Sequence, residues 1–124
     1  MLSFTRRVEV HVCTRPVDMR ASFDRLSEMV RSELVKDPLS GHLFVFVNRA
    51  RNTCKTLYWD GTGLVIIHKR LETGLFSQFN RLWGGQLQLT AAEFFLFLEG
   101  TDLSKRFIES PEEFRIPTRK RVAC

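Results

Sequence analysis

Three short apolar segments in the middle of the chain, 43–47, 56–59 and 64–68, constrain the fold most strongly. They are rich in β-branched and aromatic residues and are apolar on both alternating faces, as expected for central strands that are covered on two sides. The segments that join them, 48–55 and 60–63, are too short to contain a crossover helix. The three segments are therefore predicted to form an antiparallel β-meander.

The segment 22–34 is predicted to form an amphipathic helix. Its apolar residues recur at steps of three and four positions, and charged residues stand between them. Asp18 or Ser22 is placed to cap the start of this helix. The positive and negative charges of the helix nearly balance, so its polar face is interpreted as solvated surface and not as a binding site.

A second helix is predicted over 91–99, where Thr90 and Glu93 have the spacing of a capping box. This helix is apolar almost all round, so it must be buried in the core or against a partner. Two flanking strands are also predicted. The segment 8–13 has valines at alternate positions and fits a strand with one buried face, and 86–89 alternates in the same way.

Length and composition indicate one soluble α+β domain. The chain has 124 residues, of which 44% are hydrophobic and 27% are charged, which is typical of a globular protein. We predict a single domain over 1–108, with an antiparallel β-meander sheet packed by two to three helices, the third near 102–107. The segment 109–124 is predicted to be a basic, flexible C-terminal tail.

Cysteine usage and hydropathy indicate a cytoplasmic protein. Cys13, Cys54 and Cys124 are an odd number of cysteines without paired spacing, which favours a reducing compartment over a disulfide framework. No apolar run approaches the roughly 20 residues that a membrane-spanning helix needs. Composition therefore excludes a membrane protein and a small secreted disulfide-rich protein.

The sequence does not predict a catalytic site, a metal site or a cofactor. His11 and Cys13 form the one close pair of metal-ligating residues, with Cys54 and His68 as distant partners, and small buried side chains explain the cysteines better than zinc does. Cleavage of nucleic acid by two metal ions needs several converging carboxylates, and only Asp60 follows a predicted strand in a suitable position.

Basic residues carry more information than any other group. The formal net charge is +5, and five cations but a single acid, Asp60, lie between positions 49 and 70. The five are Arg49, Arg51, Lys55, Lys69 and Arg70. In the predicted meander they converge into one positive ridge at the tip of a hairpin, a shape that fits a DNA major groove. The alternative is that a hairpin tip is simply exposed and charged.

Several ordered blocks of sequence resemble a known family. With x for an unmatched position, they read PVDMR at 16–20, SFDxL at 22–26, DPLSGHLFVFxNR at 37–49, KxLxWDGxG at 55–63 and KRLExGxF at 69–76, and the likeness continues with LTAAE at 89–93 and LEGxDL at 98–103. In this order they resemble the TnpB-type accessory protein, from the second reading frame, of the insertion-sequence sixty-six family of bacterial transposable elements.

The resemblance implies a part in transposition, alongside a separate and larger transposase that carries the catalytic carboxylates. It names a process and not a mechanism. The residues at matched family positions are Asp18, Met19, Arg20, Asn48, Arg49, Lys55, Trp59, Asp60, Lys69, Arg70 and Glu72. Among them we expect Trp59 in the core, Asp60 bonded to turn amides, and Arg20 paired either with Glu72 or with a phosphate.

Two functions from different classes follow. The first is a non-catalytic accessory protein that contacts DNA through six cations, Arg20, Arg49, Arg51, Lys55, Lys69 and Arg70. The second is a protein-interaction module that recruits or stabilises the element-encoded transposase, for which the surplus of apolar and aromatic residues in 76–98 is the support. An enzyme in its own right has the least support. The oligomeric state is left open by the sequence.

Overall fold

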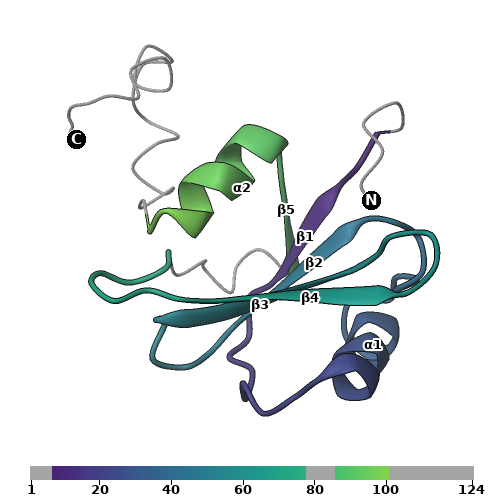
Figure 1. Cartoon of the computed structure of the whole chain (residues 1–124), viewed down its shortest axis with the longest axis horizontal. Coiled ribbons are helices and arrows are strands. Elements are labelled where there is room, and N and C mark those ends of the chain that lie inside the picture. The colour runs from purple at the N-terminus through teal and green to yellow at the C-terminus, as the bar shows by residue number, and fades with distance from the viewer. Residues whose placement is uncertain (1–6, 78–85, 101–124) are drawn as a thin grey trace.

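The computed structural model describes residues 7–77 and 86–100. They form a five-stranded sheet with one helix on each face (Figure 1). In chain order the elements are β1 (Val10–Cys13), α1 (Phe23–Ser32), β2 (Leu43–Val47), β3 (Thr53–Trp59), β4 (Leu64–Arg70), β5 (Gln86–Leu89) and α2 (Ala91–Leu98). The predicted α+β class and both predicted helices are confirmed.

The sheet is mixed, which corrects the prediction of a purely antiparallel one. Its strand order is β4-β3-β2-β1-β5, and the predicted meander is present as the antiparallel β2, β3 and β4. However, β1 lies between β2 and β5 and is parallel to β2. Parallel neighbours need a long connection, and the segment between Cys13 and Leu43 supplies it because it contains α1.

Alternation along the strands divides the core into two layers. Side chains on one face of the sheet, such as Val12 of β1 and Val45 of β2, pack in the layer that also contains Phe97 of α2. Side chains on the other face, such as Phe44 and Phe46, pack with Leu26 of α1. The sheet is therefore covered on both faces, as the apolar runs predict.

The expectation that β1 has one exposed face is wrong. All four of its residues are buried, and His11 is only 3% exposed. The reason is the mixed topology, because β1 has a strand on each side and the sheet has a helix on each face (Figure 1). A valine-polar-valine pattern at this position therefore does not mark a solvated face.

The two helices begin differently. In α2 the predicted capping box is confirmed, since the hydroxyl of Thr90 accepts a hydrogen bond from the amide of Glu93 at 3.1 Å and the carboxylate of Glu93 accepts one from the amide of Thr90 at 2.9 Å. Ser22 occupies the N-cap position of α1, but its side chain makes no capping hydrogen bond within the described structure. Asp18 is not the cap either.

Some predictions lie outside the described residues. They are the short helix near 102–107, the tail at 109–124 and most of the aromatic segment after Ser77. The domain bounds of 1–108 therefore stay a prediction. Within 7–77 and 86–100, neither helix has the length and apolar character that crossing a bilayer requires.

Candidate nucleic-acid interface

The loop between β2 and β3 is held in one conformation by Asn48. The amide of Asn48 donates to the carbonyl of Thr53, and its side-chain oxygen accepts from the amides of Asn52 and Thr53, each at 3.1 Å. The amide of Arg51 donates to the Asn48 carbonyl at 3.0 Å and closes a turn. Arg49 lies inside this turn and is exposed.

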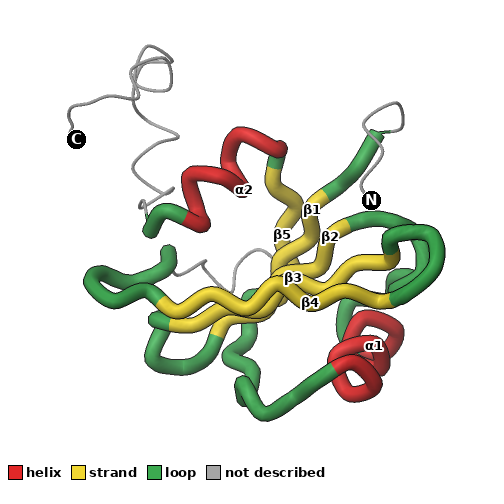
Figure 2. The backbone as a smooth tube through the Cα atoms, viewed as in Figure 1, coloured by secondary structure: helices red, strands yellow, loops and turns green. Residues whose placement is uncertain are grey.

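A second loop, after β4, packs directly on the first. The amide of Leu71 donates to the carbonyl of Asn52, and the amide of Phe76 donates to the carbonyl of Arg51, both at 2.7 Å. Figure 2 shows the two loops together at the left end of the sheet. Arg51 has a φ of +61°, an uncommon conformation for a residue other than glycine, and its guanidinium donates to the Phe76 carbonyl at 3.5 Å.

Arg70 lies at the same end of the sheet. It is the register partner of Thr53, the first residue of β3 after the loop. Its side chain is 69% exposed, and its Nε lies 3.2 Å from a carboxylate oxygen of Glu72. Arg49 and Arg51 thus lie in the loop before β3, and Arg70 is the last residue of β4, next to the end of that loop. We call these three residues the arginine end.

Lys55 is not part of this surface, contrary to the prediction. Because β3 begins at Thr53, Lys55 lies within the strand and not at the hairpin tip. The residue is only 8% exposed, and its ammonium donates to the carbonyl of Ala21 at 2.7 Å. Lys55 therefore fastens the segment before α1 to the sheet.

Lys69 also has a structural contact, on the opposite face. It is the register partner of Cys54, whereas His68 is the partner of Lys55, so the two lysines point to opposite sides of the sheet. The ammonium of Lys69 donates to the carbonyl of Leu98 at 2.6 Å, at the C-terminus of α2, where a cation is favourable. The prediction of a single ridge containing both lysines is wrong.

Arg20 is exposed but is neutralised locally. Its side chain is 92% exposed, and its Nη2 lies 2.7 Å from a carboxylate oxygen of Asp18. Hydrogen bonds from the side chain and the amide of Arg20 lower the pKa of Asp18 to about 2. Of the two alternatives for Arg20, pairing with Glu72 is wrong, because Arg20 pairs with Asp18 and Glu72 pairs with Arg70.

The hairpin between β3 and β4 has a structural role. The carboxylate of Asp60 accepts hydrogen bonds from the amides of Thr62 and Gly63, each at 2.9 Å, as predicted. These amides lower the pKa of Asp60. Trp59, which precedes the turn, is half-buried rather than within the core.

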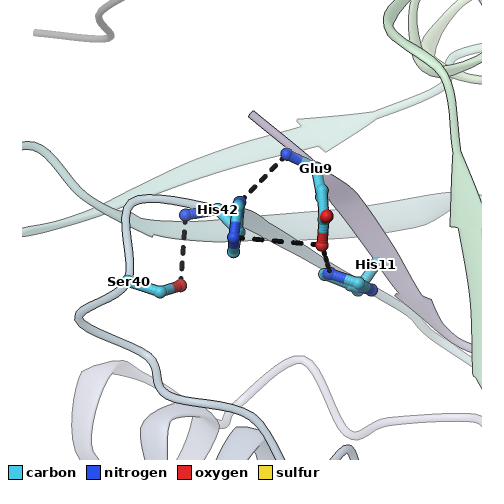
Figure 3. A network of polar contacts seen from close by, with 4 residues as sticks. All are labelled: Glu9, His11, Ser40 and His42. Carbon is cyan, nitrogen blue, oxygen red and sulfur yellow. Dashed lines mark hydrogen bonds and ion pairs between the residues drawn. The ribbon is translucent and has the colours of Figure 1, made fainter. Parts of the chain in front are cut away.

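A partly buried polar cluster around His11 was not expected from the sequence. His11 Nε2 lies 3.0 Å from a carboxylate oxygen of Glu9, and the amide of Glu9 donates to His42 Nδ1 at 3.0 Å (Figure 3). The amide of His42 in turn donates to the hydroxyl of Ser40 at 3.2 Å. The cluster therefore joins the segment that leads into β1 to the segment that leads into β2.

The surroundings of this cluster lower the pKa of both Glu9 and His11. The hydrogen bond with His11 lowers the pKa of Glu9, and burial lowers the pKa of His11 itself. Because His42 Nδ1 accepts a hydrogen bond, the neutral ring of His42 carries its proton on Nε2. The one sequence signal for the cluster is that Glu9 and His11 are two positions apart and so share a face of the strand.

The candidate metal ligands do not come together. His11 and Cys13 are two positions apart on β1 and so point to the same face of the sheet. Cys13 packs in the layer of α1, whereas Cys54 packs in the layer of α2 on the other face. Burial raises the pKa of both thiols, that of Cys54 to about 12. Across 7–77 and 86–100 there is no group of three or more histidine, cysteine or acidic residues arranged to hold a metal ion.

Comparison with known proteins identifies the family of this chain. The profile of the family described as IS66 Orf2 like protein matches residues 8–107. The chain belongs to this family. Two relatives from Sinorhizobium fredii, the uncharacterized proteins y4jC and y4hO, are each 34% identical to it, over 105 and 106 residues. The matches cover 85% and 82% of this chain, and 89% and 88% of the relatives. No solved structure matches the chain.

Membership of the IS66 Orf2 like family gives the protein an accessory role in the transposition of an insertion sequence. The match covers β1 to α2, so the arginine end and both core layers lie inside the region shared with the family. The family thus identifies the process, and the geometry at the arginine end is the starting point for a mechanism.

Proposed function

We propose that this IS66 Orf2-like protein is a non-catalytic accessory protein that contacts DNA phosphates through the arginine end. The observation that carries the proposal is that the backbones of Arg49, Arg51 and Arg70 lie at one end of the sheet, where hydrogen bonds join the β2–β3 loop to the segment after β4.

Lys55 and Lys69 are left out because each lies within a strand and its single ammonium is bound to a backbone carbonyl, at 2.7 Å and 2.6 Å. The contact of Arg51 with the Phe76 carbonyl is longer, at 3.5 Å, and a guanidinium has further N–H donors for a phosphate. Arg20 is left out because three side-chain hydrogen bonds, the shortest of 2.7 Å, join it to Asp18, whereas Arg70 makes one to Glu72, at 3.2 Å.

The chemistry of the arginine end fits a polyanion. Guanidinium groups form paired hydrogen bonds with phosphate oxygens and displace condensed counterions from the duplex. The loop that carries Arg49 and Arg51 is already fixed by Asn48, so little chain ordering opposes binding. The Glu72 carboxylate beside Arg70 is exposed and can be replaced by a phosphate as the partner of that guanidinium.

A salt titration tests this proposal. The double variant Arg49→Ala/Arg70→Ala removes two guanidinium groups and leaves Arg51, whose backbone joins the loops. Fluorescence anisotropy of a labelled duplex is measured from low to high salt for the wild type and the variant. Each lost phosphate contact lowers the slope of log affinity against log salt by about 0.9, so the slope should fall by about 1.8.

The matched control is Arg25→Ala/Arg31→Ala, which removes the same charge from exposed positions of α1. This control should keep the wild-type slope. Wild-type protein without salt-dependent binding, or a control that loses as much slope as the test variant, would refute contact through the arginine end.

A second candidate function, recruitment of the transposase, has one specific observation in its favour. Much of the aromatic surplus of 76–98 is in the core, since Phe76, Phe94 and Phe97 are buried, but Phe95 of α2 is 64% exposed. Co-purification of the transposase in the absence of DNA, lost in Phe95→Ser, would favour recruitment. Phe23→Ser is the control, because Phe23 is also exposed, at 44%, but lies on α1.

A further inference from the structure

Among the described residues, strand β4 forms one edge of the sheet, and half of its backbone groups have no strand beside them. The amide of Asp60 donates to the carbonyl of Gly63 at one end of the β3–β4 ladder, and the amide of Leu71 donates to the carbonyl of Asn52 at the other. Antiparallel pairs alternate between bonded and non-bonded residues. The amides and carbonyls of the even-numbered residues therefore point away from β3. These residues are Leu64, Ile66, His68 and Arg70.

The first four residues of this edge lack the features that protect most edge strands from pairing. Natural edges are short, bulged, charged or interrupted by proline, whereas β4 has seven residues in unbroken register with β3. Its first four residues are all apolar, and charge appears only at Lys69 and Arg70. Ile67 is 48% exposed. Among the described residues, β3 is the one strand that pairs with β4.

We propose that the partner of this edge is a second copy of the chain, whose β4 pairs antiparallel with the first to join the two sheets. A twofold axis perpendicular to the sheet relates antiparallel strands and keeps each face continuous. When the twofold axis passes beside Ile66, the outward amide and carbonyl of Ile66 form hydrogen bonds with those of the partner's Ile66. The outward groups of Leu64 then bond those of the partner's His68, and by symmetry His68 bonds the partner's Leu64. Every outward backbone group from Leu64 to His68 therefore has a partner.

Side-chain complementarity selects this register. It places Val65 opposite the partner's Ile67, so the exposed isoleucine gains an apolar neighbour. It also brings the partner's Arg70 to Thr62, where the carboxylate of Asp60 is held. An axis at Val65 would set the partner's Ile67 against Gly63, and an axis at Ile67 would set the partner's Arg70 against Leu64. The axis at Ile67 loses the charge complementarity, whereas the axis at Val65 sets the partner's Arg70 against Asp60 but leaves the exposed Ile67 without an apolar neighbour.

Sedimentation velocity of the full chain and two variants tests the proposal. The wild type should sediment as a dimer. Ile67→Lys puts two charges near the axis, and Ile66→Pro removes an outward amide without removing a β3 hydrogen bond, so both should sediment as folded monomers. Circular dichroism checks the fold. The control Phe95→Lys changes the exposed face of α2 and should remain dimeric.

Disulfide trapping tests the register. Two copies of Ile66→Cys would face each other with a Cα separation of about 5.5 Å, within disulfide range, whereas two copies of His68→Cys would be separated by roughly 14 Å along the strands. Oxidation should therefore cross-link Ile66→Cys well above the wild-type background and leave His68→Cys at that background.

Several outcomes of these experiments would contradict the proposed dimer. A monomeric wild type, a dimer that persists in Ile67→Lys, a dimer lost only in Phe95→Lys, or equal cross-linking of the two cysteine variants would overturn the proposal. If Ile66→Pro fails to fold, Ile67→Lys and the cross-linking decide alone. Because none of these variants changes the arginine end, failure of the dimer leaves the proposed DNA contact standing.

Discussion

At the scale of single residues, Lys55 makes the clearest energetic prediction. Its ammonium is buried and donates to the carbonyl of Ala21, so Lys55→Met removes a charge-assisted hydrogen bond and leaves that carbonyl without it. Urea denaturation should show a loss of about 1.5–3 kcal/mol in the free energy of unfolding. Arg49→Met is the matched control and should change it by less than about 0.5 kcal/mol, because Arg49 is exposed.

The cluster of Glu9 and His11 predicts that acid destabilises the fold. The pKa of each group is lower in the folded protein, so the unfolded chain binds more protons than the native state and stability rises with pH. The His11 contribution is complete above its unfolded pKa of about 6.5 and is lost as the pH falls through the lower folded value. The Glu9 contribution is lost at still lower pH, below about 4.3.

Urea denaturation between pH 7 and pH 5 measures the His11 part. His11→Gln keeps a donor for Glu9 but cannot be protonated there, so its free energy of unfolding should depend less on pH in this interval. His68→Gln removes an exposed imidazole and should keep the wild-type dependence. An unchanged slope in His11→Gln would contradict the assignment. Lys36, Arg7 and His42, the other ionisable groups near the cluster, are the same in both variants.

Residues differ in how far the sequence predicts them. The bonds of Asp60 and Thr90 were predicted because each side chain binds amides within three residues along the chain. The positions of the Lys55 and Lys69 side chains were not predicted, because β3 begins earlier and β4 ends later than the apolar runs suggest. Within a strand, neighbouring positions point to opposite faces, so a small error in strand ends moves a cation from one surface to another.

At the scale of elements, the two helix starts make a matched pair. In α2 the Thr90 hydroxyl caps the amide of Glu93, so Thr90→Ala should lower the free energy of unfolding by about 1 kcal/mol. Ser22 holds the same position in α1 but makes no capping bond within the described structure, so Ser22→Ala should change it much less. Equal losses in urea denaturation would contradict this difference in capping.

The elements themselves were mostly predictable because local chemistry defines them. The amphipathic repeat predicted α1, and the short connections predicted the antiparallel pairing of β2, β3 and β4. Phe95 was harder to place, because α2 is apolar nearly all round and periodicity alone does not say which aromatic residue stays exposed. The structure distinguishes Phe95 from the neighbouring Phe94, which is buried.

At the scale of the whole molecule, the position of β1 could not be predicted. Its parallel pairing with β2 spans the α1 connection, and its pairing with β5 joins Val10 to Leu89 across most of the chain. Nothing local records such long-range pairing. The position of the candidate site was predicted in part for the same reason. The backbones of Arg49, Arg51 and Arg70 lie at one end of the sheet because the β2–β3 loop is bonded to the segment after β4, while the positions of the lysines depend on strand register.

The two core layers predict cooperative unfolding of the whole molecule. Cys13 is buried in the layer of α1 and Cys54 in that of α2, and burial raises the pKa of both thiols, so neither reacts readily with iodoacetamide in the native state. Because β1, β2 and β3 contribute to both layers, loss of one layer should remove the other. Site-resolved mass spectrometry in increasing urea should therefore give one common labelling midpoint, whereas earlier labelling of Cys54 would mean that the α2 layer opens separately.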